Sequence, residues 1–281
     1  MIATFTEKGA ECCRLYNKDT KIDYLWDADE NYWGRHAPIL FPIIGKLKDN
    51  TYQYQHHTYT LNGHGFARDK VFRLFRQDED MISFVLEDDD DTYAHYPFHF
   101  RLKVTYKLEK TKMHVYYQVD NIDNKPLYFS IGGHPAFNVP LQNGEWRDYR
   151  LTIKPNAQQL RYYVSGTLID GQHPIKETLP FDWRLDYRAF ERDAMIYETP
   201  GDTSVILSNI RDDHGVTVHY NDIPYVGIWS PYPTEAPFIC IEPWWGMADT
   251  LDADGDITHK KGIITLSPDD YWSGTYSIEC Y

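Results

Sequence analysis

Short runs of β-branched and aromatic residues, separated by polar and glycine-containing turns, recur along almost the whole chain. Residues 71–75, 81–86, 98–108 and 113–119 partly alternate apolar with polar side chains, as half-buried strands do. Residues 121–126, Asn-Ile-Asp-Asn-Lys-Pro, predict a turn. This succession favours an all-β fold with few short helices. Further strands are predicted at residues 3–6, 12–16, 21–26, 127–131, 194–197, 204–208, 216–220, 225–230, 263–266 and 271–280, with a hairpin over 50–61.

Two segments are candidates for helical structure. Residues 181–192, at the end of a loop-rich region, form the best candidate for a helix. Residues 92–96 predict one helical turn after the aspartate run 88–91, which is more typical of a solvated connection than of a calcium site. No repeat, low-complexity linker or shift of composition divides the sequence, so we expect residues 1–281 to form a single domain.

Composition and charge narrow the possible partners. Hydrophobic residues make up 42% and aromatic residues 16% of the 281 residues, which is enough for a sizeable core. The formal net charge of −14 argues against non-specific binding to nucleic acid or to an anionic membrane surface. The first residues lack a basic flank followed by an apolar run, and no apolar segment approaches the ~20 residues of a membrane helix. We therefore expect neither a signal peptide nor a membrane partner, and a cytoplasmic location.

Neither a metal nor a cofactor is expected from the motifs. There is no HExxH sequence, no phosphate-binding loop and no GxSxG elbow. Residues 252–256 imitate the start of an EF-hand, but the required glycine and the final glutamate are not in place. None of the four cysteines forms a CxxC pair, so a zinc ribbon and a disulfide framework are not indicated. The cysteines are Cys12, Cys13, Cys240 and Cys280.

Residues 238–246, Phe-Ile-Cys-Ile-Glu-Pro-Trp-Trp-Gly, begin as an apolar strand in which a single carboxylate appears. Side chains alternate along a strand, so Phe238, Cys240 and Glu242 share one face. Pro243 has no N–H to donate, which predicts that the strand ends there and leaves Glu242 at the rim of a sheet. The two tryptophans that follow could wall a sugar site. Glu242 is then either a functional carboxylate or an edge-strand glutamate paired with an arginine.

A second strand also ends at an ionisable residue before a proline. Residues 127–131 lead through two glycines into His134 and Pro135. Histidine has the unperturbed pKa closest to neutrality, and an imidazole with a carboxylate suits reversible proton transfer. We expect Glu242 to be ionised and His134 to be protonated before turnover, since their proximity would favour that charge pair.

Two further segments carry candidate polar groups. Residues 33–46 contain prolines and glycines inside an apolar run, which predicts an irregular, buried segment that delivers Arg35 to a particular place; a solvated surface arginine is the alternative. In residues 62–68, Asn-Gly-His-Gly-Phe-Ala-Arg, two glycines flank His64 and allow the backbone to approach a ligand. The glycine spacing is not that of a dinucleotide-binding loop.

Together these motifs resemble the aldose 1-epimerase, or galactose mutarotase, superfamily. The resemblance rests on residues 35–42, 62–68, 133–137 and 242–244, which occur in the same order, and it covers most of the chain from about residue 26 to 249. It implies a galactose mutarotase-like β-supersandwich of mostly antiparallel strands, with a sugar in an open cleft.

The resemblance also implies roles for individual residues. It implies that Glu242 takes the proton from the C1 hydroxyl of a pyranose and that His134 protonates the ring oxygen, without a metal or an organic cofactor. It implies that His64 and Arg35 hold and polarise the sugar. The aspartate that contacts sugar hydroxyls in the family is best matched by Asp193, although the spacing is one residue off. Trp244 is predicted to contact the substrate as well.

One motif points to a particular branch of that superfamily. The His-Gly-Phe-Ala-Arg form of residues 64–68 resembles the hexose-6-phosphate 1-epimerases, in which arginines bind the phosphate. Arg68 with Arg35 or Lys46 could form such a clamp, or Arg68 could be a structural ion-pair partner. The predicted partner is thus a small sugar or sugar phosphate, and the chain is predicted to be a monomer or a homodimer.

Other classes of protein remain as alternatives. A non-catalytic carbohydrate-binding protein or a sugar sensor would use tryptophans such as Trp33 and Trp244 as a stacking platform and would need no acid–base pair. A β-sandwich glycoside hydrolase would need a second carboxylate across the cleft from Glu242. The carboxylates that could serve are Asp193, Asp249 and Glu235.

Overall fold

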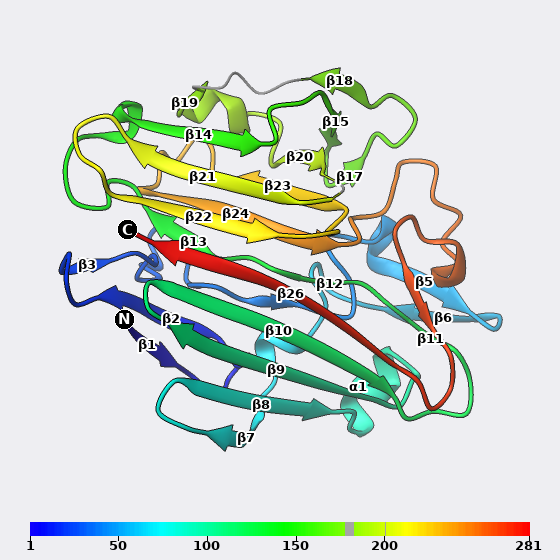
Figure 1. Ribbon diagram of the computed structural model, residues 1–281. Helices are drawn as coiled ribbons and strands as arrows, with labels where there is room; N and C mark the ends of the chain where they lie inside the picture. The colour runs from blue at the N-terminus through cyan, green and yellow to red at the C-terminus, as the bar shows by residue number, and fades with distance from the viewer. Residues whose placement is uncertain (178–182, 200) are drawn as a thin grey trace.

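Antiparallel β-strands make up most of the computed structural model, which describes residues 1–177, 183–199 and 201–281 (Figure 1). Two large sheets are layered against each other, and the first and last residues of the chain lie on the same side in Figure 1. The all-β prediction is confirmed.

The first large sheet has nine strands and carries the longest hairpin of the chain. Strands β9 and β10 pair over ten residues, and β26 pairs with the other side of β10. In spatial order the strands are β19 (Trp183–Arg184), β14 (Tyr149–Lys154), β21 (Thr203–Asn209), β22 (Gly215–Tyr220), β26 (Tyr271–Cys280), β10 (Lys112–Asn121), β9 (Phe100–Glu109), β8 (Met81–Glu87) and β7 (Arg73–Gln77).

The second large sheet has eight strands and contains the segment around Glu242. Seven of them follow one another across the sheet, and β13 (Ala136–Asn138) pairs with β24 in addition. In spatial order the seven are β18 (Ile175–Glu177), β15 (Gln159–Tyr162), β20 (Met195–Glu198), β23 (Tyr225–Trp229), β24 (Phe238–Trp245), β12 (Ile131–Gly133) and β4 (Ile39–Leu40).

Smaller elements complete the described fold. The small sheets are formed by β1 (Ile2–Phe5), β2 (Cys12–Asn17) and β3 (Ile22–Asp23), by β5 (Thr51–Tyr54) and β6 (His57–Thr60), by β11 (Leu127–Phe129) and β25 (Ile264–Leu266), and by β16 (Val164–Ser165) and β17 (Leu168–Ile169). The helices are α1 (Asp90–His95) and the 3-10 turns Lys48–Asn50, Ala67–Asp69, Trp146–Asp148, Tyr187–Phe190 and Ile257–His259. None of these described helices has the length and apolar character needed to span a membrane.

Strand β24 has one face in the main core and carries Glu242 on the other face. Ile239 and Ile241 are fully buried in the same apolar cluster as Val115 of β10 and Val218 of β22. This face therefore packs toward the nine-stranded sheet, and the alternate side chains, Glu242 among them, lie on the opposite face.

The structure corrects the predicted end of this strand. β24 continues to Trp245, and Glu242 is buried within the sheet instead of lying at its rim. The N–H of Ile241 donates to the carbonyl of Pro135, so the nitrogen of Pro243 faces the same neighbour. There the neighbouring strand is interrupted between β12 and β13. Because Pro243 has no backbone N–H and the neighbouring strand is interrupted there, no hydrogen bond between the strands is lost. The proline is therefore tolerated inside β24.

The predicted helix over residues 181–192 is also wrong in its described part. Residues 181 and 182 lie outside the described residues, Trp183–Arg184 form β19, and Tyr187–Phe190 form a single 3-10 turn. Pairing with β14 and the stacking of Tyr187 on Trp146, at 4.0 Å between ring centroids, override the local helical preference. The predicted turn at residues 92–96 is confirmed as part of α1, whose first turn is capped by Asp89.

The buried face of β24 leads to a prediction about stability. Ile241→Ala should lower the free energy of unfolding by about 2–5 kcal/mol, since it removes apolar contacts and leaves a cavity in the core. Ile210→Ala is the matched control, because Ile210 is 42% exposed, and it should change stability by no more than about 0.5 kcal/mol. Denaturant unfolding measures both. Equal losses in the two variants would contradict the packing described for β24.

Candidate active site

Strand register brings Glu242 and His134 together. β12 pairs with β24 at Trp244, and β13 pairs with β24 at Cys240. His134 stands midway between the two short strands, so it lies across from Glu242 on the same face of the sheet. The N–H of His134 donates to the carbonyl of Pro38 at 3.1 Å, which fixes the backbone of this junction.

The two side chains form a buried acid–base pair. His134 Nε2 lies 3.1 Å from Glu242 Oε2, and the side chains are only 8% and 1% exposed. Glu242 is therefore not paired with an arginine, the alternative that the sequence left open. Burial is nearly complete for both groups, so the charged form of each is disfavoured.

The pKa shifts of the pair run against the charge pair expected from the sequence. Burial raises the pKa of Glu242 well above its usual value, and the nearby Asp193 carboxylate raises it further. Burial also lowers the pKa of His134 well below its usual value, and the neighbouring His64 lowers it further. These directions favour one shared proton on the carboxyl group beside a neutral imidazole.

A cavity of about 350 Å³ opens above the pair. Six of the seven residues predicted from the sequence to form the site line it, and Arg35 does not. The lining residues are Trp33, Gly45, Lys46, Gly63, His64, Arg68, His134, Val164, Thr167, Ile169, Asp193, Ala194, Ile196, Trp229, Glu242, Trp244 and Ala248.

Aromatic rings hold the imidazole of His134 in place. The ring of Trp33 stacks on it with centroids 4.8 Å apart and an interplanar angle of 26°. Trp229, the last residue of β23, meets it edge-on at 5.8 Å. Apolar faces of this kind pack well against the C–H face of a pyranose and keep water away from the pair.

His64 is held as a neutral hydrogen-bond donor. It has φ = 67°, a left-handed conformation that is rare for a residue with a side chain, and the N–H of Gly45 donates to its Nδ1 at 3.2 Å. Nδ1 is thus the acceptor, and the proton of the neutral ring sits on Nε2. Burial lowers the pKa of His64 to about 3, helped by the charges of Arg68 and Arg35, so the ring stays neutral near pH 7.

The glycine after His64 is required by a close approach of two backbones. A Cβ at Gly65 would collide with the carbonyl of Phe41, and Gly65 has φ = 70°. Packing of this backbone against the irregular segment 33–46 therefore explains why a glycine follows His64. The only strand in that segment is the two-residue β4.

The two arginines occupy different places. Arg68 lines the cavity, donates from Nη2 to the carbonyl of Gly63 at 2.7 Å, and has a buried Nε without a hydrogen-bond partner among the described residues. Burial lowers its pKa to about 10, and the charge of Arg35 adds to the shift. Arg35 lies in an adjoining hollow that shares Arg68 and Trp33 with the cavity, and its guanidinium pairs with Asp69 at 2.9 Å.

Asp193 enters the cavity from the start of β20. It has φ = 67°, and its carboxylate accepts the N–H of Ala194 at 2.9 Å. Burial raises its pKa. Of the other carboxylates that a glycoside hydrolase could have used, Glu235 is exposed in a loop and Asp249 is paired with Lys260, and neither lines the cavity.

Two parts of the cavity wall were not predicted. Trp229 lies in a predicted strand, and pairing that strand with residues 238–242 would have found it. The hairpin of β16 and β17 contributes Val164, Thr167 and Ile169 from a region predicted only as loop-rich, and no local pattern marks it.

Comparison with known proteins shows the family of this chain. The family model described as aldose 1-epimerase matches residues 1–265. The chain belongs to the aldose 1-epimerase family. This is a family of isomerases. A relative in Lactococcus lactis subsp. lactis, the plasmid-borne protein LacX, is 30% identical over 98% of this chain and 94% of that protein.

Solved structures show the same fold. A galactose mutarotase related enzyme from Lactobacillus acidophilus is 36% identical with a TM-score of 0.97, and it is matched over 99% of this chain and 94% of that one. A galactose mutarotase-like protein from Lactobacillus casei is 32% identical with a TM-score of 0.90, over 99% and 96% of the two chains. The fold of this family member is thus the predicted galactose mutarotase-like sandwich of mostly antiparallel strands.

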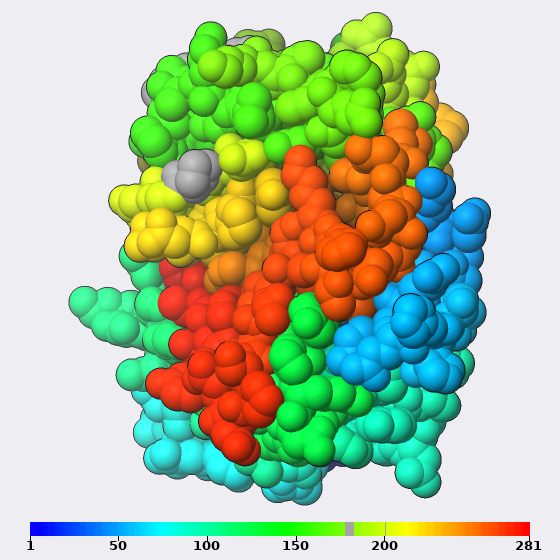
Figure 2. Space-filling view, turned by 90° about the vertical axis from the view of Figure 1, so that its right-hand side faces the viewer, coloured from blue at the N-terminus to red at the C-terminus, as the bar shows by residue number. Residues whose placement is uncertain are grey.

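Segments from distant parts of the sequence meet at one side of the cavity in this family member. Figure 2 shows the orange segment around residues 245–260 between the green segment around 160–170 and the blue segment around 45–60. Each of the three segments contributes a lining residue to the cavity: Val164, Lys46 and Ala248.

Asp249 ties these segments together. Its N–H donates to the carbonyl of Lys46 at 2.9 Å, and its own carbonyl accepts the N–H of Ile169 at 2.9 Å. Its carboxylate accepts the N–H of Lys48 at 3.0 Å and the ammonium group of Lys260 at 2.8 Å. Lys46 and Ile169 both line the cavity, so this one residue positions two of its walls.

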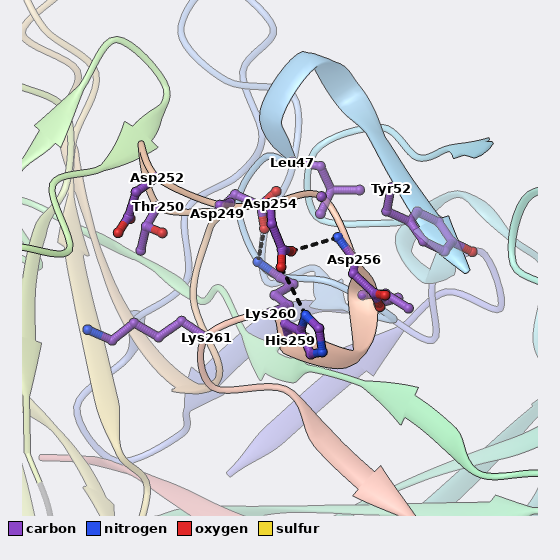
Figure 3. Close-up of a pocket in the computed structure, with 13 residues that line it drawn as sticks. Leu47, Tyr52, Asp249, Thr250, Asp252, Asp254, Asp256, His259, Lys260 and Lys261 are labelled. Atoms are coloured by element: carbon purple, nitrogen blue, oxygen red, sulfur yellow. Dashed lines mark hydrogen bonds and ion pairs between the residues drawn. The ribbon is translucent and has the colours of Figure 1, made fainter. Parts of the chain in front are cut away.

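The ion pair of Asp249 and Lys260 is fully buried beside a smaller hollow (Figure 3). The two side chains are 4% and 2% exposed. The Lys260 ammonium also donates to the carbonyl of Met247 at 2.8 Å. Burial lowers the pKa of Lys260 while Asp249 opposes that shift. Removing one partner would leave the other as an uncompensated buried charge.

This pair generates a second stability prediction. Lys260→Met should lower the free energy of unfolding by about 3–5 kcal/mol, because the Asp249 carboxylate loses its counter-charge in a buried position. Lys112→Met is the matched control: Lys112 pairs with Glu279 at the surface, with side chains 45% and 37% exposed, and should cost no more than about 1 kcal/mol. Urea unfolding compares the two. Similar losses of unfolding free energy in the two variants would show that the buried ion pair contributes no more to stability than the surface pair.

Proposed function

We propose that this chain interconverts the α and β anomers of an aldohexose by acid–base ring opening. The observation that carries the proposal is the buried contact of His134 Nε2 with Glu242 Oε2, 3.1 Å apart at the base of a sugar-sized cavity. Membership of the aldose 1-epimerase family gives the reaction class. A glycoside hydrolase would instead need a second carboxylate as the partner of Glu242, and an imidazole stands beside it.

The proton balance of the reaction fits the pair. Ring opening removes a proton from the C1 hydroxyl and delivers one to the ring oxygen, so the sugar gains no net charge. Glu242 acts as the base and His134 as the acid, and their roles reverse when the ring closes on the other face after rotation about C1–C2. One proton held between two atoms 3.1 Å apart can produce the reactive form by a single transfer, without exchange with solvent.

The remaining lining residues hold the sugar in this proposal. His64 donates from Nε2–H to a sugar oxygen, and Asp193 accepts from sugar hydroxyls. Trp33, Trp229 and Trp244 provide apolar walls. Arg35 stays a predicted substrate contact, although it would first have to leave Asp69. Neither a metal nor an organic cofactor takes part in the proposed reaction, and residues 1–281 are taken to act as one domain.

A hexose 6-phosphate is the second candidate substrate. Arg68 and Lys46 both line the cavity, and Arg68 Nε has no hydrogen-bond partner among the described residues. Guanidinium groups bind phosphate oxygens strongly. In such a substrate the phosphate would lie toward Arg68, and the pyranose would keep its place above the acid–base pair.

The first functional test removes the proposed base. Glu242→Gln should abolish anomerisation of freshly dissolved α-D-glucose, α-D-galactose and glucose 6-phosphate in polarimetry, because the amide cannot accept the hydroxyl proton. Glu235→Gln, a change at an exposed glutamate outside the cavity, is the matched control and should keep the activity. A wild-type chain that binds sugar without accelerating anomerisation would favour the non-catalytic carbohydrate-binding alternative.

The Glu242→Gln variant should be at least as stable as the wild-type chain. The pKa of Glu242 is higher in the folded than in the unfolded chain, so the folded state keeps a proton that the unfolded state releases above the usual carboxyl pKa. The free energy of unfolding therefore falls as pH rises toward the folded pKa. Glu242→Gln removes this loss, and thermal unfolding at pH 8 should show an unchanged or higher midpoint. A clearly lower midpoint would mean that the carboxylate contributes to stability.

The pH profile tests the shared proton. The active form holds one proton on the pair, and the pKa of His134 is lowered while that of Glu242 is raised. The acid limb of kcat/KM should thus lie below the usual histidine value of about 6.5, and the plateau should extend through neutral pH. Asp193→Asn should move the alkaline limb to lower pH, since that carboxylate helps to raise the pKa of Glu242. An acid limb above pH 6.5 would mean that the pair must lose its shared proton to become active, which would contradict this protonation scheme.

A further inference from the structure

A thiol lies against the acid–base pair. Cys240 precedes Glu242 by two residues on β24, so its side chain lies on the same face, and it is fully buried. One ligand atom from each of His134, Cys240 and Glu242 lies within 4.8 Å of the other two. Across residues 1–177, 183–199 and 201–281, no other three histidine, cysteine or acidic side chains come together in this way.

The donors of this cluster are free to bind a metal ion. Glu242 Oε2 and His134 Nδ1 are buried without a hydrogen-bond partner among the described residues, although Oε2 lies 3.1 Å from His134 Nε2, and Cys240 forms no disulfide. His134 and Glu242 line the cavity, whereas Cys240 does not. An ion could therefore reach the first two ligands from the cavity and then meet the thiol behind them.

We propose that His134, Cys240 and Glu242 bind one Zn²⁺ ion at the base of the cavity, and that the ion reversibly inhibits the enzyme. Imidazole nitrogen, thiolate sulfur and carboxylate oxygen are the three ligand types that zinc takes in proteins, and three protein ligands leave a fourth position open to the cavity. The charges of the ion, the thiolate and the carboxylate sum to zero with a neutral imidazole. A buried site accepts such a neutral cluster far better than an isolated charge.

The required movement is small. Zinc–ligand distances of about 2.0–2.3 Å bring the ligand atoms of a tetrahedral site to within about 3.3–3.8 Å of one another. The widest spacing of 4.8 Å therefore shortens by about 1 Å, which side-chain rotation can supply. The ion would then bind the same side-chain atoms of His134 and Glu242 that carry the proton in the proposed reaction. Metal binding and turnover therefore exclude each other.

Metal binding can be measured without any activity. The full chain, freed of metal by a chelator, is titrated with Co²⁺, whose bond to a thiolate gives a charge-transfer band in the near ultraviolet. We expect one equivalent to produce the band and Zn²⁺ to remove it. Cys240→Ala and the more conservative Cys240→Ser should both lose the band. Cys280→Ala, a change at another fully buried thiol that lies outside the cluster, should keep it.

The inhibition experiment rests on the proposed function, whereas the cobalt titration does not. Zn²⁺ should slow anomerisation by the wild-type chain, and a chelator should restore it. Cys240→Ala should keep the basal rate and need at least about tenfold more Zn²⁺ for the same inhibition.

The possible outcomes separate the two proposals. A cobalt band in a wild-type chain that lacks anomerase activity would remove the proposed function and leave the metal site standing. No band in the wild-type chain, or a band that persists in both Cys240 variants, would overturn the metal site.

Discussion

Burial of a carboxylate against an imidazole is the condition on which this site depends. Glu242 and His134 face each other because β12 and β13 pair with β24 on either side of a two-residue interruption. Slippage of β24 by a single residue would turn Glu242 toward the core and away from His134. Ile239 and Ile241 alternate with Glu242 along β24. They are buried in the core and anchor the register from the opposite face of the sheet. The packing of the sandwich and the geometry of the pair therefore depend on the same strand.

The local electrostatics of the cavity differ from those of the whole chain. The protein carries a formal charge of −14, yet Arg68 and Lys46 line the cavity and Arg35 lies in the hollow beside it. Arg68 and Arg35 help to keep His64 neutral by lowering its pKa, and burial itself disfavours charge on the acid–base pair. An uncharged resting pair suits a reaction in which the substrate gains and loses one proton at different oxygens. The same absence of fixed charge leaves the pair, with Cys240, able to accept a divalent cation.

Support for the cavity comes from residues outside it. Asp249 connects the segment around Lys46 with the hairpin of β16 and β17, and Lys260 neutralises its buried carboxylate. Within the cavity wall itself, Trp33 and Trp229 pack against the imidazole of His134 from two sides. Rigid support of this kind would place the proposed acid and base before a sugar arrives, which reduces the cost of orienting them during the proposed reaction.

The sequence by itself determined the family, six of the lining residues and most of the strands outside the region predicted as loop-rich, which in fact contains β14 to β19, because period-two alternation and motifs of adjacent residues are local. It predicted the segments of β9, β10 and β26 closely, and six of the seven residues named for the site lie around one cavity. It failed where a partner distant in sequence decides: β24 passes through Pro243 because its neighbour is interrupted there, and β19 replaces a helix because β14 pairs with it.

Only the tertiary structure decided the burial that shifts the pKa values of the pair, the position of Arg35 beside Asp69, and the presence of Trp229 and the β16–β17 hairpin in the wall. Desolvation and long-range contact depend on what the folded chain places around a residue, and no local pattern of amino acids contains that information.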